Sequence, residues 1–233
     1  MEASAGIGFD LDHTLAIDNK LERVAFMRLL ELVEEHGGSA IGTLNDESDR
    51  IDSLLSQQRE GAFSIEEAIR QFVVDRGVEA RDFYVERFVK MVLEMVDEFV
   101  IPLPGVKRTL AALRERGVPV AVLSNGWNPL QIRKAQRAGF EGPVLASADI
   151  GQQKPSARAF EALTGALGTQ AERTWFVGDD PWCDVNGSRD AGLHAVWFDW
   201  EHKEFPAELR PPPYTIHALE ELLDLLPAVV STT

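Results

Sequence analysis

Beyond residue 105 the chain alternates between short apolar runs and segments with helical periodicity, and this alternation limits the fold more than any other feature. The runs VPVAVLS, PVLAS, TWFVG and LHAVWFD read as strands, and a helical segment follows each of the first three before the next run. Short, continuously apolar strands that alternate with helices are typical of a parallel sheet covered on both faces. The sequence therefore predicts an α/β fold with a doubly wound parallel sheet.

The stretch from about residue 19 to residue 100 has a different, purely helical periodicity. It separates one predicted strand, GIGFD, from all the others. The simplest topology is an α/β core that leaves after its first strand, builds an all-helical domain and returns through the stiff connector IPLPG. We therefore expect residues 1–15 and 102–233 to form the core and residues 16–101 to form the helical domain.

Polar residues follow the predicted strands, at the edge where open parallel sheets bind ligands. They are Asp10 and Asp12 after the first strand, Ser124 and Asn125 after the second, and Asp179 and Asp180 after a later one. Residues two apart on a strand point to the same side, so Asp10 and Asp12 are expected to crowd together with Asp179. Such carboxylates repel one another unless a cation binds, and a donor set made only of oxygen favours Mg²⁺.

The other polar side chains predicted near these carboxylates are of types that bind a phosphate group. Lys154, in QQKPS, supplies positive charge, and Ser124 can donate a hydrogen bond to a phosphoryl oxygen. One of the two aspartates in DLD can attack phosphorus to form an aspartyl-phosphate. The other can protonate the leaving oxygen and later deprotonate the hydrolytic water. This combination points to phosphoryl-transfer chemistry.

Four short motifs stand at these strand ends and helix starts. They are Asp10-Leu11-Asp12-His13-Thr14-Leu15, Ser124-Asn125, Lys154-Pro155, and Gly178-Asp179-Asp180-Pro181 with Asp184. In this order they resemble the motifs of the haloacid dehalogenase-like (HAD) hydrolase superfamily, which implies a Rossmann-like core with a helical cap inserted after the first motif. His13 departs from the usual glycine, but histidine tolerates positive φ better than most residues, so we expect the motif to keep its shape.

The resemblance implies a role for each motif residue. Asp10 is the implied nucleophile and Asp12 the general acid/base. The implied Mg²⁺ ligands are Asp10, the backbone carbonyl of Asp12, and Asp179, with Asp180 or Asp184 in support. The implied phosphate-binding residues are Ser124, Asn125 and Lys154. The expected activity is that of a Mg²⁺-dependent phosphomonoesterase acting on a small phosphorylated metabolite.

Several alternatives stay open at the level of sequence. The stretch SNGWNPLQIRKAQRAGF is similar to family members that hydrolyse nucleoside monophosphates or acylneuraminate phosphates, but no motif in the helical domain names a substrate. A phosphomutase uses the same catalytic parts. A haloacid dehalogenase attacks carbon, needs no Mg²⁺ and lacks the second aspartate. A non-catalytic binding protein that retains the fold is the remaining alternative.

Charge and composition limit the partners and the compartment. The net charge of −15 disfavours nucleic-acid polymers and anionic membranes as partners. No apolar run approaches the length of a membrane span, about 18 residues, and the N-terminus lacks the pattern of a signal peptide. Cys183 is the only cysteine, which excludes an internal disulfide and favours a reducing compartment. We therefore expect a cytoplasmic monomer or homodimer.

Overall fold

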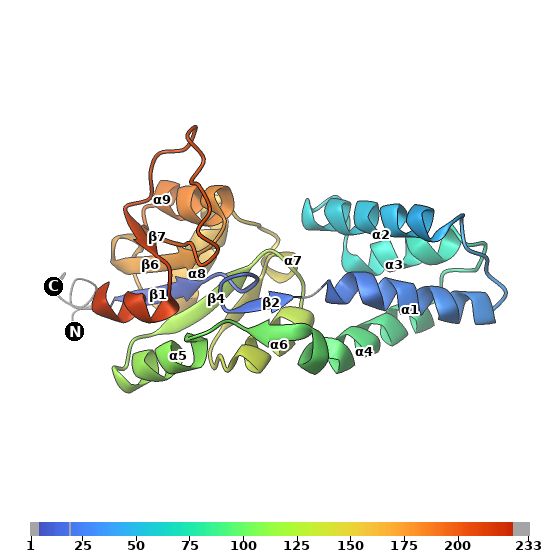
Figure 1. Cartoon of the computed structure of the whole chain (residues 1–233), viewed down its shortest axis with the longest axis horizontal. Coiled ribbons are helices and arrows are strands. Elements are labelled where there is room, and N and C mark those ends of the chain that lie inside the picture. The colour runs from blue at the N-terminus through green and yellow to red at the C-terminus, as the bar shows by residue number, and fades with distance from the viewer. Residues whose placement is uncertain (1–4, 19, 226–233) are drawn as a thin grey trace. The chain divides into compact units, whose positions relative to one another are not determined.

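A six-stranded parallel sheet forms the centre of the first of two units into which the chain divides (Figure 1). The computed structural model describes residues 5–18 and 20–225. Of these, residues 5–18 and 100–225 belong to the first unit and residues 20–99 to the second. The strands run in the order β5-β4-β1-β6-β7-β8, and every neighbouring pair is parallel. The predicted α/β core is confirmed.

The first unit is built from short elements. Its sheet contains β1 (Gly6–Phe9), β4 (Val120–Ser124), β5 (Val144–Ala146), β6 (Thr174–Gly178), β7 (His194–Phe198) and β8 (Tyr214–Ile216). Its helices are α5 (Val106–Glu115), α6 (Leu130–Ala138), α7 (Ser147–Ile150), α8 (Ala157–Leu167) and α9 (Gly187–Asp190), with a π-helical turn at Pro181–Asn186 and 3₁₀ turns at Ala171–Arg173 and Leu219–Glu221. Helices α5 and α6 lie on one side of the sheet, and α8 and α9 lie on the other (Figure 1).

A small antiparallel ladder joins β2 (Ala16–Asp18) to β3 (Val100–Pro102). In the division into two units this ladder lies with the sheet, and the boundaries fall after Asp18 and after Phe99. Neither strand is predicted from the sequence, because three residues are too few to show a period of two.

The central strand β1 is held by close packing against α8. Ile7 and Phe9 are fully buried, and on the α8 side of the sheet Phe160 meets Phe176 edge to face with ring centroids 5.1 Å apart. Gly8 is what permits this approach, because a Cβ there would lie 2.4 Å from Leu163 Cδ2. This packing fixes the strand that delivers Asp10 to the edge of the sheet.

The second unit is helical. It contains α1 (Leu21–Glu35), α2 (Leu44–Arg59), α3 (Ile65–Val74) and α4 (Asp82–Phe99). Phe26 packs against Phe72 and Phe88, with ring centroids 5.0 and 4.6 Å from its own, and forms the centre of the core. The Thr43 and Asp46 side chains form a reciprocal capping box at the start of α2. Among the described residues, no helix combines the length and the hydropathy that crossing a bilayer requires.

We expect Gly8→Ala to lower the free energy of unfolding by about 1–3 kcal/mol, because the added methyl group would overlap Leu163 and Phe176 in a packed core. Gly165→Ala is the matched control, since this exposed glycine of α8 has no neighbouring atom within 4 Å of the new Cβ. The control should gain about 0.5–1 kcal/mol through helix propensity. Urea unfolding followed by circular dichroism measures both, and equal effects would contradict this account of the packing.

Candidate active site

The chain turns sharply after β1. The Asp10 N–H donates to the carbonyl of Val177 (2.9 Å) and so keeps Asp10 against β6. The N–H groups of Leu15 and Ala16 then both donate to the carbonyl of Leu11, at 2.9 and 3.1 Å. His13 adopts a φ of 62°, so histidine takes the left-handed conformation here, as expected from the sequence. The turn sends the side chains of Asp10 and Asp12 to different places.

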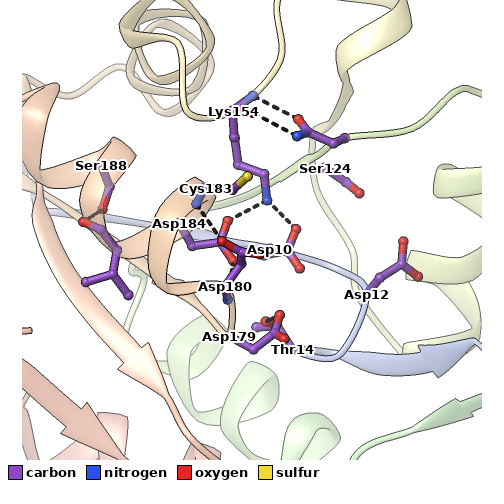
Figure 2. A network of polar contacts seen from close by, with 12 residues as sticks. Asp10, Asp12, Thr14, Ser124, Lys154, Asp179, Asp180, Cys183, Asp184 and Ser188 are labelled. Carbon is purple, nitrogen blue, oxygen red and sulfur yellow. Dashed lines mark hydrogen bonds and ion pairs between the residues drawn. The ribbon is translucent and has the colours of Figure 1, made fainter. Parts of the chain in front are cut away.

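Three carboxylates converge at the edge of the sheet (Figure 2). They belong to Asp10, Asp179 and Asp184, and one oxygen of each lies within 4.8 Å of the others. We call these three residues the carboxylate group. Lys154 Nζ donates to Asp10 Oδ1 and, at 2.7 Å, to Asp184 Oδ1. Asp10, Asp184 and Lys154 are buried, so the interactions are poorly screened by solvent.

Burial and nearby negative charges raise the pKa of all three carboxyls. Burial raises the pKa of Asp10 well above its ordinary value and that of Asp184 as well, against the opposing charge of Lys154. Burial and the charge of Asp184 raise the pKa of Asp179 to about 7. Fully ionised, the three carboxyls would carry more negative charge than one lysine neutralises, and their raised pKa values show that this charge is unfavourable without a further cation. Oxygen donors with this excess charge fit a hard divalent cation such as Mg²⁺.

Lys154 is correspondingly difficult to deprotonate. Burial alone would lower the pKa of Lys154, but the charges of Asp10 and Asp184 raise it above its ordinary value. Its backbone is fixed by the Asn125 side chain, which donates to the Lys154 carbonyl (2.9 Å) and accepts from the Lys154 N–H (2.8 Å). Asn125, predicted to bind phosphate, thus uses its amide to position Lys154.

The Asp12 carboxylate faces α6 instead of the carboxylate group. Its Oδ1 accepts from Lys134 Nζ at 2.9 Å, and its Oδ2 accepts from Gln131 Nε2 at 3.2 Å. Burial alone would raise the pKa of Asp12, but Lys134 and Gln131 hold it below its ordinary value. The expectation that Asp12 crowds together with Asp10 and Asp179 is wrong. The chain leaves the strand after Phe9, so Asp12 no longer follows its alternation. Asp184, from the π-helical turn, lies with Asp10 and Asp179 instead.

The two remaining acidic candidates differ in what they contact. Asp180 caps the π-helical turn, where its Oδ1 accepts from the N–H groups of Trp182 (2.8 Å) and Cys183 (2.6 Å). Its own N–H donates to Asp184 Oδ2 at 3.0 Å, which orients the Asp184 carboxylate. Asp184 is therefore the one that joins the carboxylate group, and Asp180 supports it from the backbone.

Ser124 is the last residue of β4 and is buried next to α6. Its Oγ accepts a hydrogen bond from Gln131 Nε2 at 2.9 Å. Because Gln131 supplies the hydrogen in that bond, the hydroxyl hydrogen of Ser124 stays available for another acceptor. The same glutamine thus touches both Ser124 and Asp12.

Sequence reasoning missed Gln131 and Lys134. Both lie on the buried face of α6 together with Leu130, Ala135 and Ala138. Lys134 also pairs with Asp18 Oδ2 of β2 at 2.6 Å. Two polar side chains three residues apart on the apolar face of an amphipathic helix were the signal that could have identified them.

Comparisons with known proteins agree with this architecture. The sequence model of a family described as haloacid dehalogenase-like hydrolase matches residues 5–192.

A ribulose-1,5-bisphosphate 5-phosphatase from Halopiger xanaduensis is 33% identical over 134 residues, which cover 53% of this chain and 56% of that protein, little more than half its length. The pyrimidine 5′-nucleotidase PynA of Streptococcus pneumoniae is 25% identical over 231 residues, 94% of this chain and 93% of that protein. The crystal structure of a 2-haloacid dehalogenase from Pseudomonas syringae shares the fold, with a TM-score of 0.76 at 24% identity over 97% of this chain and 99% of that one.

We expect Lys154→Met to lower the free energy of unfolding of the metal-free chain by about 3–5 kcal/mol near neutral pH, because it leaves Asp10 and Asp184 buried without their cation. The loss should shrink as the pH falls. Without Lys154 both carboxyls have folded-state pKa values above their unfolded values, so protonation favours the folded chain.

Lys90→Met is the matched control for this lysine. Lys90 and its partner Glu94 are exposed, and such pairs contribute little, so the change should stay within about 0.5 kcal/mol. Urea unfolding in EDTA at neutral and mildly acidic pH compares the two variants. A Lys154→Met chain as stable as the control at neutral pH would contradict the electrostatic account of the site.

Proposed function

The chain belongs to the haloacid dehalogenase-like hydrolases, and we propose that it is a Mg²⁺-dependent phosphomonoesterase that hydrolyses a small phosphorylated metabolite. The observation that carries the proposal is the carboxylate group with Lys154 at the carboxyl edge of the sheet, next to a separately held Asp12. The helical insert, predicted at residues 16–101, is the proposed cap. The single cysteine and the strongly negative charge support a cytoplasmic enzyme whose partner is a small metabolite.

The donors at the site suit Mg²⁺. Asp10, Asp179 and the backbone carbonyl of Asp12 would hold the ion, and Asp184 is the supporting residue. All of these donors are oxygens, which matches the preference of Mg²⁺. A bound ion would offset the negative charge that the carboxylates and a phosphate bring together.

Asp10 is the nucleophile in this proposal. A carboxylate oxygen of Asp10 forms a bond to phosphorus, the bond from phosphorus to the leaving oxygen breaks, and an aspartyl-phosphate results. Lys154 sits against the same carboxylate and would hold a phosphoryl oxygen beside it. The free hydroxyl hydrogen of Ser124 would donate to another phosphoryl oxygen.

Asp12 is the proposed acid/base. It would give a proton to the leaving oxygen and then take one from the water that attacks the aspartyl-phosphate. Lys134 donates to one oxygen of its carboxylate and Gln131 to the other, and these two bonds fix its orientation. The presence of a second aspartate held by two hydrogen bonds favours a phosphatase, because a haloacid dehalogenase lacks that aspartate.

We expect the wild-type chain to release phosphate from p-nitrophenyl phosphate only when Mg²⁺ is present, and Asp10→Asn to lose this activity about a thousandfold or more. The amide of asparagine cannot act as the nucleophile. Asp190→Asn, which alters an exposed aspartate of α9, should keep wild-type activity. Colorimetric assays with and without EDTA measure all three proteins, and a panel of nucleoside monophosphates and sugar phosphates then identifies the substrate class.

Other outcomes would select the alternatives. Release of chloride from 2-chloropropionate without metal would show a dehalogenase. Isomerisation of a sugar phosphate without release of phosphate would show a phosphomutase. Binding of panel compounds without turnover would show a non-catalytic protein that retains the fold.

Asp12→Asn should separate the two half-reactions. p-Nitrophenolate leaves without needing a proton, so Asp10 can still be phosphorylated, whereas hydrolysis of the aspartyl-phosphate stalls without a base. We therefore expect a burst of about one p-nitrophenolate per chain followed by slow turnover. Alkyl phosphates, whose leaving oxygen needs the proton, should give no burst. Rapid-mixing absorbance measures the burst, and undiminished steady turnover in this variant would remove Asp12 from the mechanism.

A further inference from the structure

A second group of metal-ligating side chains lies at the carboxyl edge of β7 and β8. Asp199 directly follows β7, His202 lies in the loop that comes next, and His217 directly follows β8. One ligand atom from each lies within 4.8 Å of the other two. We call these residues the His–Asp cluster. It shares no residue with the carboxylate group.

The sheet fixes Asp199 in place. Its N–H donates to the carbonyl of Ile216 at 2.9 Å, and its Oδ1 accepts from the N–H of Lys203 at 2.7 Å. The side chain is only 5% exposed, and its Oδ2 lies 3.5 Å from His217 Nδ1. One buried carboxylate oxygen is therefore aimed at the histidines while the other is engaged by the backbone.

His217 has one ring nitrogen committed and one available. Its Nδ1 lies 2.8 Å from the carbonyl oxygen of Asp199, which can only accept, so Nδ1 carries the hydrogen. In the neutral ring the lone pair then resides on Nε2. A hydrogen bond from one ring nitrogen to a carbonyl is the device that orients histidines which bind metals through the other nitrogen. The side chain is 47% exposed, so an ion from solvent can reach it.

His202 is brought to the cluster by an uncommon backbone conformation. Its φ is 55°, in the left-handed region that few non-glycine residues adopt. Its ring stacks on that of His217, with centroids 4.7 Å apart and planes inclined by 26°. Within residues 5–18 and 20–225, neither nitrogen of the His202 ring has a hydrogen-bond partner. The cluster thus contains an exposed imidazole whose neutral ring can offer its lone pair from either nitrogen, according to the tautomer.

We propose that Asp199, His202 and His217 bind a divalent transition-metal ion such as Zn²⁺. Two imidazole nitrogens and one carboxylate oxygen are donors that Zn²⁺ accepts when water fills its fourth position. Imidazole favours zinc, copper, nickel or iron over Mg²⁺. The His202 ring has to turn about its Cβ–Cγ bond to direct a nitrogen at an ion held by His217 Nε2, and this torsion is broad for an exposed histidine.

Two tryptophans near Asp199 in the chain contact the active-site region. Trp197 of β7 donates from Nε1 to the carbonyl of Asp179 at 3.0 Å. Trp200, next to Asp199, stacks on His13 with ring centroids 6.5 Å apart. A metal ion that ties Asp199 to His202 and His217 would therefore order the loop beside the turn that carries Asp12.

Titration of the full chain with Co²⁺ in the presence of excess Mg²⁺ tests the site, because Mg²⁺ competes for oxygen donors and not for imidazole. We expect a single Co²⁺ per chain with visible absorption bands, and with Cu²⁺ an electron paramagnetic resonance spectrum split by nitrogen ligands. His202→Asn and His217→Asn should each weaken binding about tenfold or more.

These variants are chosen to keep the fold. Asparagine tolerates the left-handed conformation at position 202, and at position 217 its amide can still donate to the Asp199 carbonyl. His194→Asn is the matched control, since His194 opens β7 at the opposite edge of the sheet and bonds to the carbonyl of Glu172. It should bind Co²⁺ as the wild type does.

The metal titrations of the three variants distinguish a specific site from non-specific binding. Loss of affinity and of nitrogen splitting in the variants at 202 and 217, with both kept in the variant at 194, supports the site. Co²⁺ binding to the wild type no tighter than to His202→Asn, or a Cu²⁺ spectrum without nitrogen splitting, would overturn it. Phosphatase assays have no part in this test, so its failure leaves the proposed function untouched.

Discussion

The buried ion pairs of Lys154 with Asp10 and Asp184 are the interaction on which the edge of the sheet depends. A lone buried carboxylate is strongly destabilising, and two such groups can lie side by side only because one cation is shared between them. Asp179 adds a third carboxyl whose pKa burial and repulsion raise to about 7. Full ionisation of the three carboxyls is therefore unfavourable at this point, and a divalent cation would relieve the repulsion between them.

The turn that follows β1 gives two aspartates, two residues apart, opposite surroundings. Asp10 lies among other carboxylates, and burial raises its pKa, whereas Lys134 and Gln131 keep the pKa of Asp12 low. These shifts run opposite to the proposed roles, because a nucleophile is ionised and a general acid is protonated; a divalent cation beside Asp10 would lower its pKa and favour the nucleophilic form. The strand ends at Phe9, so Asp12 no longer follows the alternation of β1, and the left-handed conformation of His13 (φ 62°) continues the turn after it.

The parallel-sheet core and the residues at its strand ends could be predicted from the sequence. The contacts within the site could not, for physical reasons. Buried parallel strands appear in the sequence as continuous apolar runs, so these runs predict the core and the strand ends at Asp10, Ser124 and Asp179. Which of Asp180 and Asp184 faces the site could not be predicted, since it depends on a π-helical turn that no simple period describes. The contact of Lys134 with Asp12 joins residues 122 apart in the chain, and only the packing of α6 brings it about.

One topological rule accounts for both sets of metal-ligating residues. In a parallel sheet the carboxyl ends of all strands meet at one edge, so β1 and β6 deliver Asp10 and Asp179, while β7 and β8 deliver Asp199 and His217 to the same edge. The two sets differ in chemistry, because oxygen donors suit a hard cation and imidazole suits a transition metal. Mg²⁺ does not compete for imidazole, whereas a transition metal can also bind carboxylates, where only an excess of Mg²⁺ keeps it out. A single sheet edge can therefore hold a reactive site at its centre and a structural ion toward its end when Mg²⁺ is the more abundant ion.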